Sequence, residues 1–304
     1  MSIEASLQIP EAIELRLTCS VDLKVDQIKD VTWNKKSFEH LVVDNVTKEL
    51  VQALVVNHIA DEQGTDIIER KGKGLIILLH GGPGTGKTFT AESVAELAEK
   101  PLFRVTCGDI GTEPEKVEKY LESVLHLGKA WDCVVLIDEA EVFLEQRSLD
   151  NLERNALVSV FLRVLEYYEG ILILTSNRVG TFDEAFKSRI LLSLHYENLT
   201  RGQRTKIWKN FLVRLRELGG NTSDKIDFHD IECYIEDLTK YDLNGRQIRN
   251  VLTAGRQYAN FKKERMAFHH LKHAIDVSSK FEKYLKTVQE GYSDYQVIRT
   301  EGVR

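Results

Sequence analysis

The sequence has few of the residues that build stiff linkers or covalent cross-links. Its 304 residues include only four prolines and four cysteines. The cysteines lie far apart and form no C-x-x-C pair, which argues against a zinc ribbon or a disulfide framework. They are Cys19, Cys107, Cys133 and Cys233. We therefore expect a reducing, intracellular compartment, either the cytoplasm or the nucleus.

Long hydrophobic runs and an excess of basic charge are also missing. No apolar stretch approaches the ~20 residues that a membrane span requires. The first residues lack the basic start and apolar core of a signal peptide. The formal net charge is −6, whereas a nucleic-acid binder usually carries a basic face. We expect no membrane span, and the charge argues against nucleic acid as the main partner without excluding it.

Short apolar runs alternate with helical patterns over the first two thirds of the chain. The runs have strand length and are apolar at successive positions, as in strands buried on both faces of a parallel sheet. They cover residues 75–79, 102–107, 133–137, 171–174 and 192–196. Helical patterns cover residues 88–99, 113–129 and about 149–168. This alternation predicts βαβ units and an α/β fold with a mostly parallel sheet.

After residue 198 the strand signal stops and only helical patterns follow. Two pairs are spaced as helix-capping boxes, Thr112 with Glu115 and Thr200 with Gln203. The chain is therefore divided into a leader at 1–30, an α/β nucleotide-binding domain at 31–198, a helical domain at 199–290 and a tail at 291–304.

Gly81 to Thr88 match the pattern G-x-x-x-x-G-K-[ST] between a predicted strand and a predicted helix. Backbone amides of such a loop converge on phosphates at the positive end of the helix. Lys87 is predicted to reach the β- and γ-phosphates, and Thr88 to bind Mg²⁺. The alternative, a glycine-rich turn that binds nothing, requires a chance match. The predicted nucleotide contacts in this segment are Gly82, Pro83, Gly84, Thr85, Gly86, Lys87, Thr88 and Phe89.

Further polar positions lie at or near the ends of the following strands. Asp138 ends an apolar strand and is predicted to hold Mg²⁺ opposite Thr88. The next residue, Glu139, is predicted to be the general base that polarises the attacking water. Asn177 either orients that water or forms a turn. Arg189 either reaches the γ-phosphate of a neighbouring subunit or forms a surface ion pair.

The four elements, in this order and spacing, resemble the AAA+ ATPases. The matching motifs are Walker A (Gly81 to Thr88), Walker B (Ile137 to Glu139), sensor 1 (Asn177) and an arginine finger (Arg189). Strings such as Arg154 to Arg163 look like those of a fungal group of AAA-domain ATPases. The resemblance covers about residues 31–288.

The resemblance implies a five-stranded parallel sheet of order 5-1-4-3-2 and a C-terminal helical lid. It also implies ATP and Mg²⁺ at the junction of sheet and lid, and a ring-like homo-oligomer, possibly a hexamer. Hydrolysis of the β–γ anhydride would involve Lys87, Glu139, Asn177 and Arg189. Gly245 and Arg246 would be nucleotide contacts from the lid.

Three positions depart from the family pattern. The first pore loop has Asp109-Ile110-Gly111, with an acidic residue at the usual aromatic place, so peptide threading is not supported. The finger string has a single arginine, as in clamp loaders. Ile248 occupies the usual sensor 2 position, where either Arg246 or Arg249 is a substitute, or both are solvated.

The leading hypothesis is a Mg²⁺-dependent ATPase whose turnover moves the lid or subunits and remodels an unidentified protein partner. One alternative is an ATP-switched assembly module with little turnover. Another is a clamp-loader-like, nucleic-acid-associated ATPase. A possible metal pair, His269 and His273, lies on a late helix, where a solvated polar face is the stronger reading.

Overall fold

The computed structural model describes residues 31–60, 74–106, 113–147, 151–178, 182–217 and 225–289, with side chains up to residue 280. The elements described below belong to the compact unit Asn34–Arg304. The leader at 1–30, Thr112, the pore-loop string 109–111 and the tail at 291–304 lie outside the described residues.

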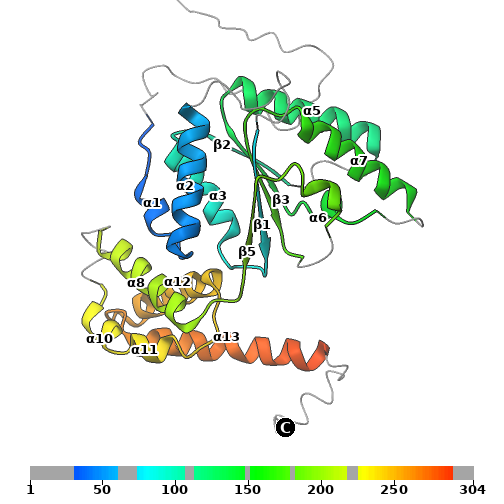
Figure 1. The fold of residues 1–304 in the computed structure, drawn as a ribbon. Helices are drawn as coiled ribbons and strands as arrows, with labels where there is room; N and C mark the ends of the chain where they lie inside the picture. The colour runs from blue at the N-terminus through cyan, green and yellow to red at the C-terminus, as the bar shows by residue number, and fades with distance from the viewer. Residues whose placement is uncertain are drawn as a thin grey trace, which may run out of the picture. The chain divides into compact units, whose positions relative to one another are not determined.

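Five parallel strands form one sheet in the order β2-β3-β4-β1-β5 (Figure 1). This confirms the predicted order. The strands are β1 Leu75–Gly81, β2 Leu102–Thr106, β3 Val134–Asp138, β4 Ile171–Ser176 and β5 Leu192–Tyr196. Their bounds agree with the five apolar runs to within two residues.

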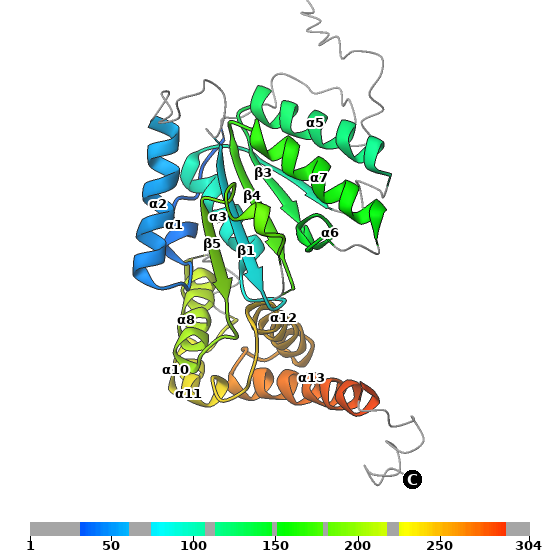
Figure 2. The same cartoon turned by 45° about the vertical axis from the view of Figure 1, so that its right-hand side comes forward.

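Helices cover both faces of this sheet, which explains why its central strands are apolar at successive positions (Figures 1 and 2). Side chains alternate along β1, so Leu75, Ile77 and Leu79 join one core and Ile76 and Leu78 join the other. The first core is covered by α1 Lys36–Glu39, α2 Asn45–Ala60 and α3 Lys87–Ala98. The second is covered by α5 Pro114–Ala130, α6 Glu141–Leu144 and α7 Leu152–Glu166.

Residues beyond β5 form helices with a core of their own around the fully buried Trp208. The helices are α8 Arg201–Glu217, α10 Phe228–Cys233, α11 Ile235–Leu238, α12 Gly245–Lys262 and α13 Phe268–Gln289. The predicted capping box before α8 is present: the Thr200 amide donates to Gln203 Oε1 at 2.8 Å, and the Gln203 amide donates to Thr200 Oγ1 at 3.3 Å. At α5 the N-cap is Glu113, and its side chain makes no capping hydrogen bond.

The strand register gathers the polar residues at one edge of the sheet. Ile137 pairs with Leu174, and Leu79 pairs with Thr175. Asp138, at the end of β3, therefore lies opposite Thr175 on β4. Both residues are close to the end of β1, where the glycine-rich loop begins. Because parallel strands all end at the same edge, residues far apart in the sequence meet there.

Candidate nucleotide-binding site

The glycine-rich loop connects β1 directly to α3, as the motif predicts. Gly84 and Gly86 have φ of 73° and 110°, a left-handed region that favours glycine. The buried Lys87 ammonium donates to the carbonyl oxygens of Gly81 at 2.8 Å and Gly82 at 2.7 Å. Lys87 thus lies folded against the loop that it is predicted to serve.

The charges around Lys87 identify which acidic and basic groups share its site. Burial lowers the pKa of the Lys87 ammonium, and the nearby carboxylate of Glu141 opposes that shift more than Asp138 or Glu139 does. The positive charge of Arg246, at the start of α12, lowers the pKa further. Arg246 is therefore a lid arginine whose charge acts at the loop.

The carboxylate of Asp138, which ends β3, is held on both of its oxygens. Thr175 Oγ1 donates to Oδ1, and Arg104 on β2 donates to Oδ2 at 2.5 Å. The same Thr175 hydroxyl accepts the backbone N–H of Glu139 at 3.0 Å. One buried threonine on β4 therefore connects both acidic residues at the end of β3 to the neighbouring strand.

Glu139 has an exposed side chain and a φ of 60°. A non-glycine residue in this left-handed region is strained, and such strain clusters at functional sites. Strand β3 ends at Asp138, and a turn begins at Glu139. The hydrogen bond from the Glu139 N–H to the Thr175 hydroxyl stabilises that turn.

Asn177 follows β4, and its backbone N–H donates to Glu141 Oε1 at 2.5 Å. The Asn177 side chain is exposed. Glu141 was missed by sequence reasoning, although it lies only two residues after Glu139 at the start of α6. A third carboxylate in the string Asp-Glu-Ala-Glu was the available signal.

Arg189 packs against its own chain. Its guanidinium donates to Glu166 Oε2 at 3.1 Å and to the Ala185 carbonyl at 3.0 Å, and 26% of its side chain is exposed. This ion pair with the end of α7 matches the surface-pair alternative in the protomer. An arginine acting on a neighbouring subunit would have to leave Glu166.

The N-terminus of α12 contacts the glycine-rich loop directly. The Gly245 amide donates to the Gly84 carbonyl at 3.0 Å. Asn244 caps this 18-residue helix in a complete capping box with Gln247. Ile248, at the usual sensor 2 position, is fully buried in the lid core, so it offers nothing polar to a nucleotide.

His269 and His273 on α13 are exposed, as the stronger reading of a solvated polar face expects, and they do not come together as a metal pair. His273 stacks on Tyr258 with ring centroids 4.8 Å apart, whereas His269 and His270 approach Glu264. The Ala267 amide donates to His270 Nδ1 at 3.2 Å, so the proton of the neutral ring lies on Nε2. That nitrogen is 3.2 Å from Glu264 Oε2, without hydrogen-bond alignment. His270 therefore serves the helix N-terminus and has no free lone pair for a metal.

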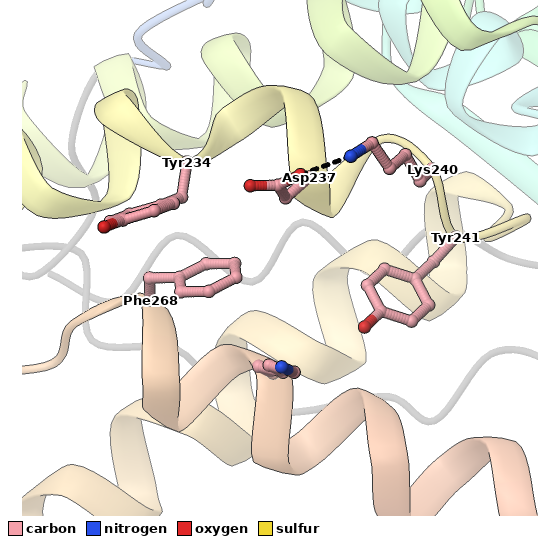
Figure 3. A pocket seen from close by; sticks show the side chains of 6 residues that line it. Tyr234, Asp237, Lys240, Tyr241 and Phe268 are labelled. Carbon is pink, nitrogen blue, oxygen red and sulfur yellow. Dashed lines mark hydrogen bonds and ion pairs between the residues drawn. The ribbon is translucent and has the colours of Figure 1, made fainter.

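A hollow of ≈ 460 Å³ lies in the lid (Figure 3). It is lined by Tyr234, Asp237, Lys240, Tyr241, Phe268 and Lys272. Tyr234 and Phe268 stack with centroids 4.7 Å apart, and Asp237 pairs with Lys240 at 2.6 Å. None of the residues predicted to bind nucleotide lines this hollow.

The sheet order, the loop from β1 to α3 and the acidic end of β3 together define a P-loop nucleotide-binding domain. Two family models match adjoining parts of the chain: the ATPase family associated with various cellular activities (AAA) at 77–197, and the fungal AAA+ ATPase lid domain at 199–292. The chain belongs to the AAA+ ATPases.

Several relatives share part of the sequence. A Lon protease from Mycolicibacterium smegmatis is 26% identical over 240 residues, covering 66% of this chain and 30% of the relative. Fidgetin-like protein 1 from Caenorhabditis briggsae is 32% identical over 165 residues, covering 47% of this chain and 28% of the relative. This chain spans less than a third of the length of either.

The crystal structure of the FIGL-1 AAA domain has the same fold. It superposes with a TM-score of 0.59 at 19% identity, covering 85% of this chain and 91% of that one. None of the described helices is long and apolar enough to cross a membrane.

Proposed function

We propose that this protein hydrolyses the β–γ anhydride of ATP in a Mg²⁺-dependent reaction and couples turnover to movement of the lid. The observation that carries the proposal is that Lys87, Asp138 and Glu139 meet at the carboxyl edge of one parallel sheet, where Glu141 also holds the Asn177 amide. A glycine-rich turn without function gives no reason for these charges to gather there.

The residues present fit a magnesium ion. Mg²⁺ prefers oxygen ligands, and Thr88 and Asp138 offer a hydroxyl and a carboxylate. Within the described part of the chain, the Thr88 hydroxyl has no hydrogen-bond partner and remains available. Thr88 and Asp138 would hold the ion, and a bound Mg²⁺ would neutralise charge on the β- and γ-phosphates.

The chain's own groups divide the remaining tasks. The loop amides and Lys87 bind the phosphates, with Lys87 exchanging its bonds to Gly81 and Gly82 for phosphate oxygens. Glu139 accepts a proton from the attacking water, which its exposed carboxylate can reach. Asn177 orients that water. Glu141 holds the Asn177 backbone and thereby links the sensor segment to the acidic edge.

Gly245 and Arg246 are the first residues of α12. The Gly245 amide is bonded to the phosphate loop and the charge of Arg246 acts on Lys87, which supports their assignment as nucleotide contacts. Because the Gly245 amide is bonded to the Gly84 carbonyl, any displacement of the phosphate loop acts directly on the start of α12. Of the two candidate lid arginines, the electrostatics favour Arg246. We propose that this connection converts turnover into lid and subunit movement that remodels a protein partner within a ring-like homo-oligomer.

The test is the rate of ATP hydrolysis of Glu139→Gln beside its affinity for ATP. Loss of a general base lowers turnover by roughly 10²–10⁴-fold, and binding should be retained because the loop and Lys87 are intact. Glu122→Gln, an exposed glutamate on α5, is the control. Unchanged hydrolysis in Glu139→Gln would show that Glu139 is not the base.

A second candidate is an ATP-switched assembly module with little turnover. It is favoured by Arg189, which is paired with Glu166 of its own chain rather than extended. Steady turnover of about 1 s⁻¹ or faster, the ordinary enzyme range, would remove this candidate. Turnover near zero together with nucleotide-dependent assembly would support it.

A further inference from the structure

Arg104 on β2 has no role in the proposed hydrolysis reaction. Its guanidinium donates to Oδ2 of Asp138 at 2.5 Å, while Thr175 occupies Oδ1. Arg104 is paired with Leu136 in the β2–β3 register, two residues before Asp138. Its long side chain therefore runs along the strand for about 6.6 Å to reach the carboxylate.

The position of Arg104 allows its side chain to move away from Asp138 into solvent. β2 is an edge strand of the sheet, and 52% of the Arg104 side chain is exposed, against 11% for Asp138. The carboxylate is thus fixed by its burial and by Thr175, whereas its cationic partner lies mostly toward solvent. Arginine cannot lose its charge in a protein, so only displacement frees Oδ2.

A cation that is already paired with a carboxylate opposes the binding of a second cation to that carboxylate. It does so directly if both need the same oxygen, and through charge repulsion if the metal binds another lone pair or an intervening water. In both cases removal of the arginine charge leaves a more negative site. The paired guanidinium also keeps the buried carboxylate satisfied when no metal is bound.

We propose that Arg104 is a positioning residue that acts as the resident counter-cation of Asp138 and competes with the divalent metal for it. Binding of metal is then an exchange, in which the arginine moves toward solvent as the ion arrives. The inference rests on the proposed function only in taking Asp138 as a metal ligand. It adds a residue from β2 that sets how much metal the site requires.

The experiment measures metal affinity rather than hydrolysis. Mn²⁺ is titrated into the full chain with saturating ADP, and free Mn²⁺ is followed by electron paramagnetic resonance. Arg104→Met keeps the aliphatic stem but removes the charge, and should tighten Mn²⁺ binding about three- to fivefold, the scale of a partly exposed ion pair. Arg104→Lys keeps a cation and should stay close to the unmodified protein.

The matched control is Arg163→Met. Arg163 forms a comparable ion pair with Glu118, with side-chain exposures of 59% and 28%, and should leave Mn²⁺ affinity unchanged. Unchanged or weaker Mn²⁺ binding in Arg104→Met would overturn the proposal, since it would make Arg104 neutral or supportive toward the metal. Weaker ADP binding in EDTA for Arg104→Met would also overturn it, because Arg104 would then contact the nucleotide.

Asp138→Asn separates this inference from the proposed function. If Asp138→Asn weakens Mn²⁺ binding and Arg104→Met does not strengthen it, the metal assignment stands and the exchange alone is wrong. If Asp138→Asn leaves Mn²⁺ affinity unchanged, Asp138 is not a ligand and both statements fail.

Discussion

The side chain of Asn244 fills the space that a Cβ atom on Gly84 would need. A Cβ built there would lie 2.6 Å from both Cγ and Oδ1 of Asn244. The phosphate loop and the start of the lid helix α12 are therefore in contact through a position where only glycine fits. The Gly245 amide, bonded to the Gly84 carbonyl, lies beside it.

Gly84→Ala should loosen the start of α12, because the new methyl group displaces Asn244 from its cap. Hydrogen exchange at the Gly245–Ile248 amides should become faster, since the contact to the loop is lost. Gly86→Ala is the matched control: Gly86 also has a positive φ, but a Cβ there meets nothing within 4 Å. Equal effects of the two substitutions would attribute the change to backbone strain alone.

Thr175→Val should destabilise the acidic edge of the sheet by about 1–3 kcal/mol, because Asp138 and the Glu139 amide each lose a buried partner. Urea denaturation measures the free energy of unfolding. The rate of ATP hydrolysis should also fall in Thr175→Val. Thr175→Ser retains the hydroxyl and should recover most of both.

The control for Thr175 is Thr205→Val on α8, where an exposed hydroxyl donates to the Arg201 carbonyl at 3.0 Å. That change should cost less than about 0.5 kcal/mol. If Thr175→Val were as mild, the bridge between β3 and β4 would contribute little.

Glu166→Gln tests whether the Arg189 ion pair restrains a residue that acts between subunits. If Arg189 stabilises charge in a neighbouring site, hydrolysis per subunit should rise with protein concentration and fall by about a hundredfold or more in Arg189→Ala. Freeing Arg189 from Glu166 should then lower the concentration at half-maximal activity. Activity that is independent of concentration and insensitive to Arg189 would leave Arg189 as a surface ion pair.

His270 should make lid stability depend on pH. Its pKa is lowered mainly by burial, assisted by the neighbouring His269. Below about pH 6.5 the unfolded chain takes up a proton that the folded chain resists, so stability is full above that pH and falls below it. The loss is at most about 1.4 kcal/mol per pH unit.

The measurement is the melting temperature at pH 7.5 and pH 5.5. His270→Gln keeps an acceptor for the Ala267 amide, as in an ordinary capping box, and should reduce the difference between the two temperatures. His126→Gln, at an exposed position on α5, should leave that difference nearly unchanged. A full pH difference in His270→Gln would assign it to other groups.

Residues whose role depends only on nearby positions in the chain could be predicted from the sequence. The phosphate loop is one continuous segment between a buried strand and a helix, so spacing alone identified Gly84, Gly86 and Lys87. The two capping residues before α8 are equally local. Such features need only the periodicity of one element and the glycines that its turn requires.

Residues that act across elements could not be predicted in the same way. Arg104 and Thr175 meet the acidic edge from β2 and β4, and no spacing in the chain connects them to it. Their proximity depends on strand register, which aligns Thr106 with Asp138 and Leu174 with Ile137. A shift of one residue in either pair would turn those side chains to the opposite face.

The sequence by itself determined the elements, the order of the motifs and the identity of the phosphate loop, because these follow from local patterns of apolar and glycine residues. Only the tertiary structure decided which partners those residues have: that Asp138 is shared by Arg104 and Thr175, that Arg189 is paired with Glu166, and that the charge of Arg246 acts on Lys87. These relationships depend on the packing of separate strands and helices, and Coulomb and hydrogen-bond interactions act over distances that only packing sets.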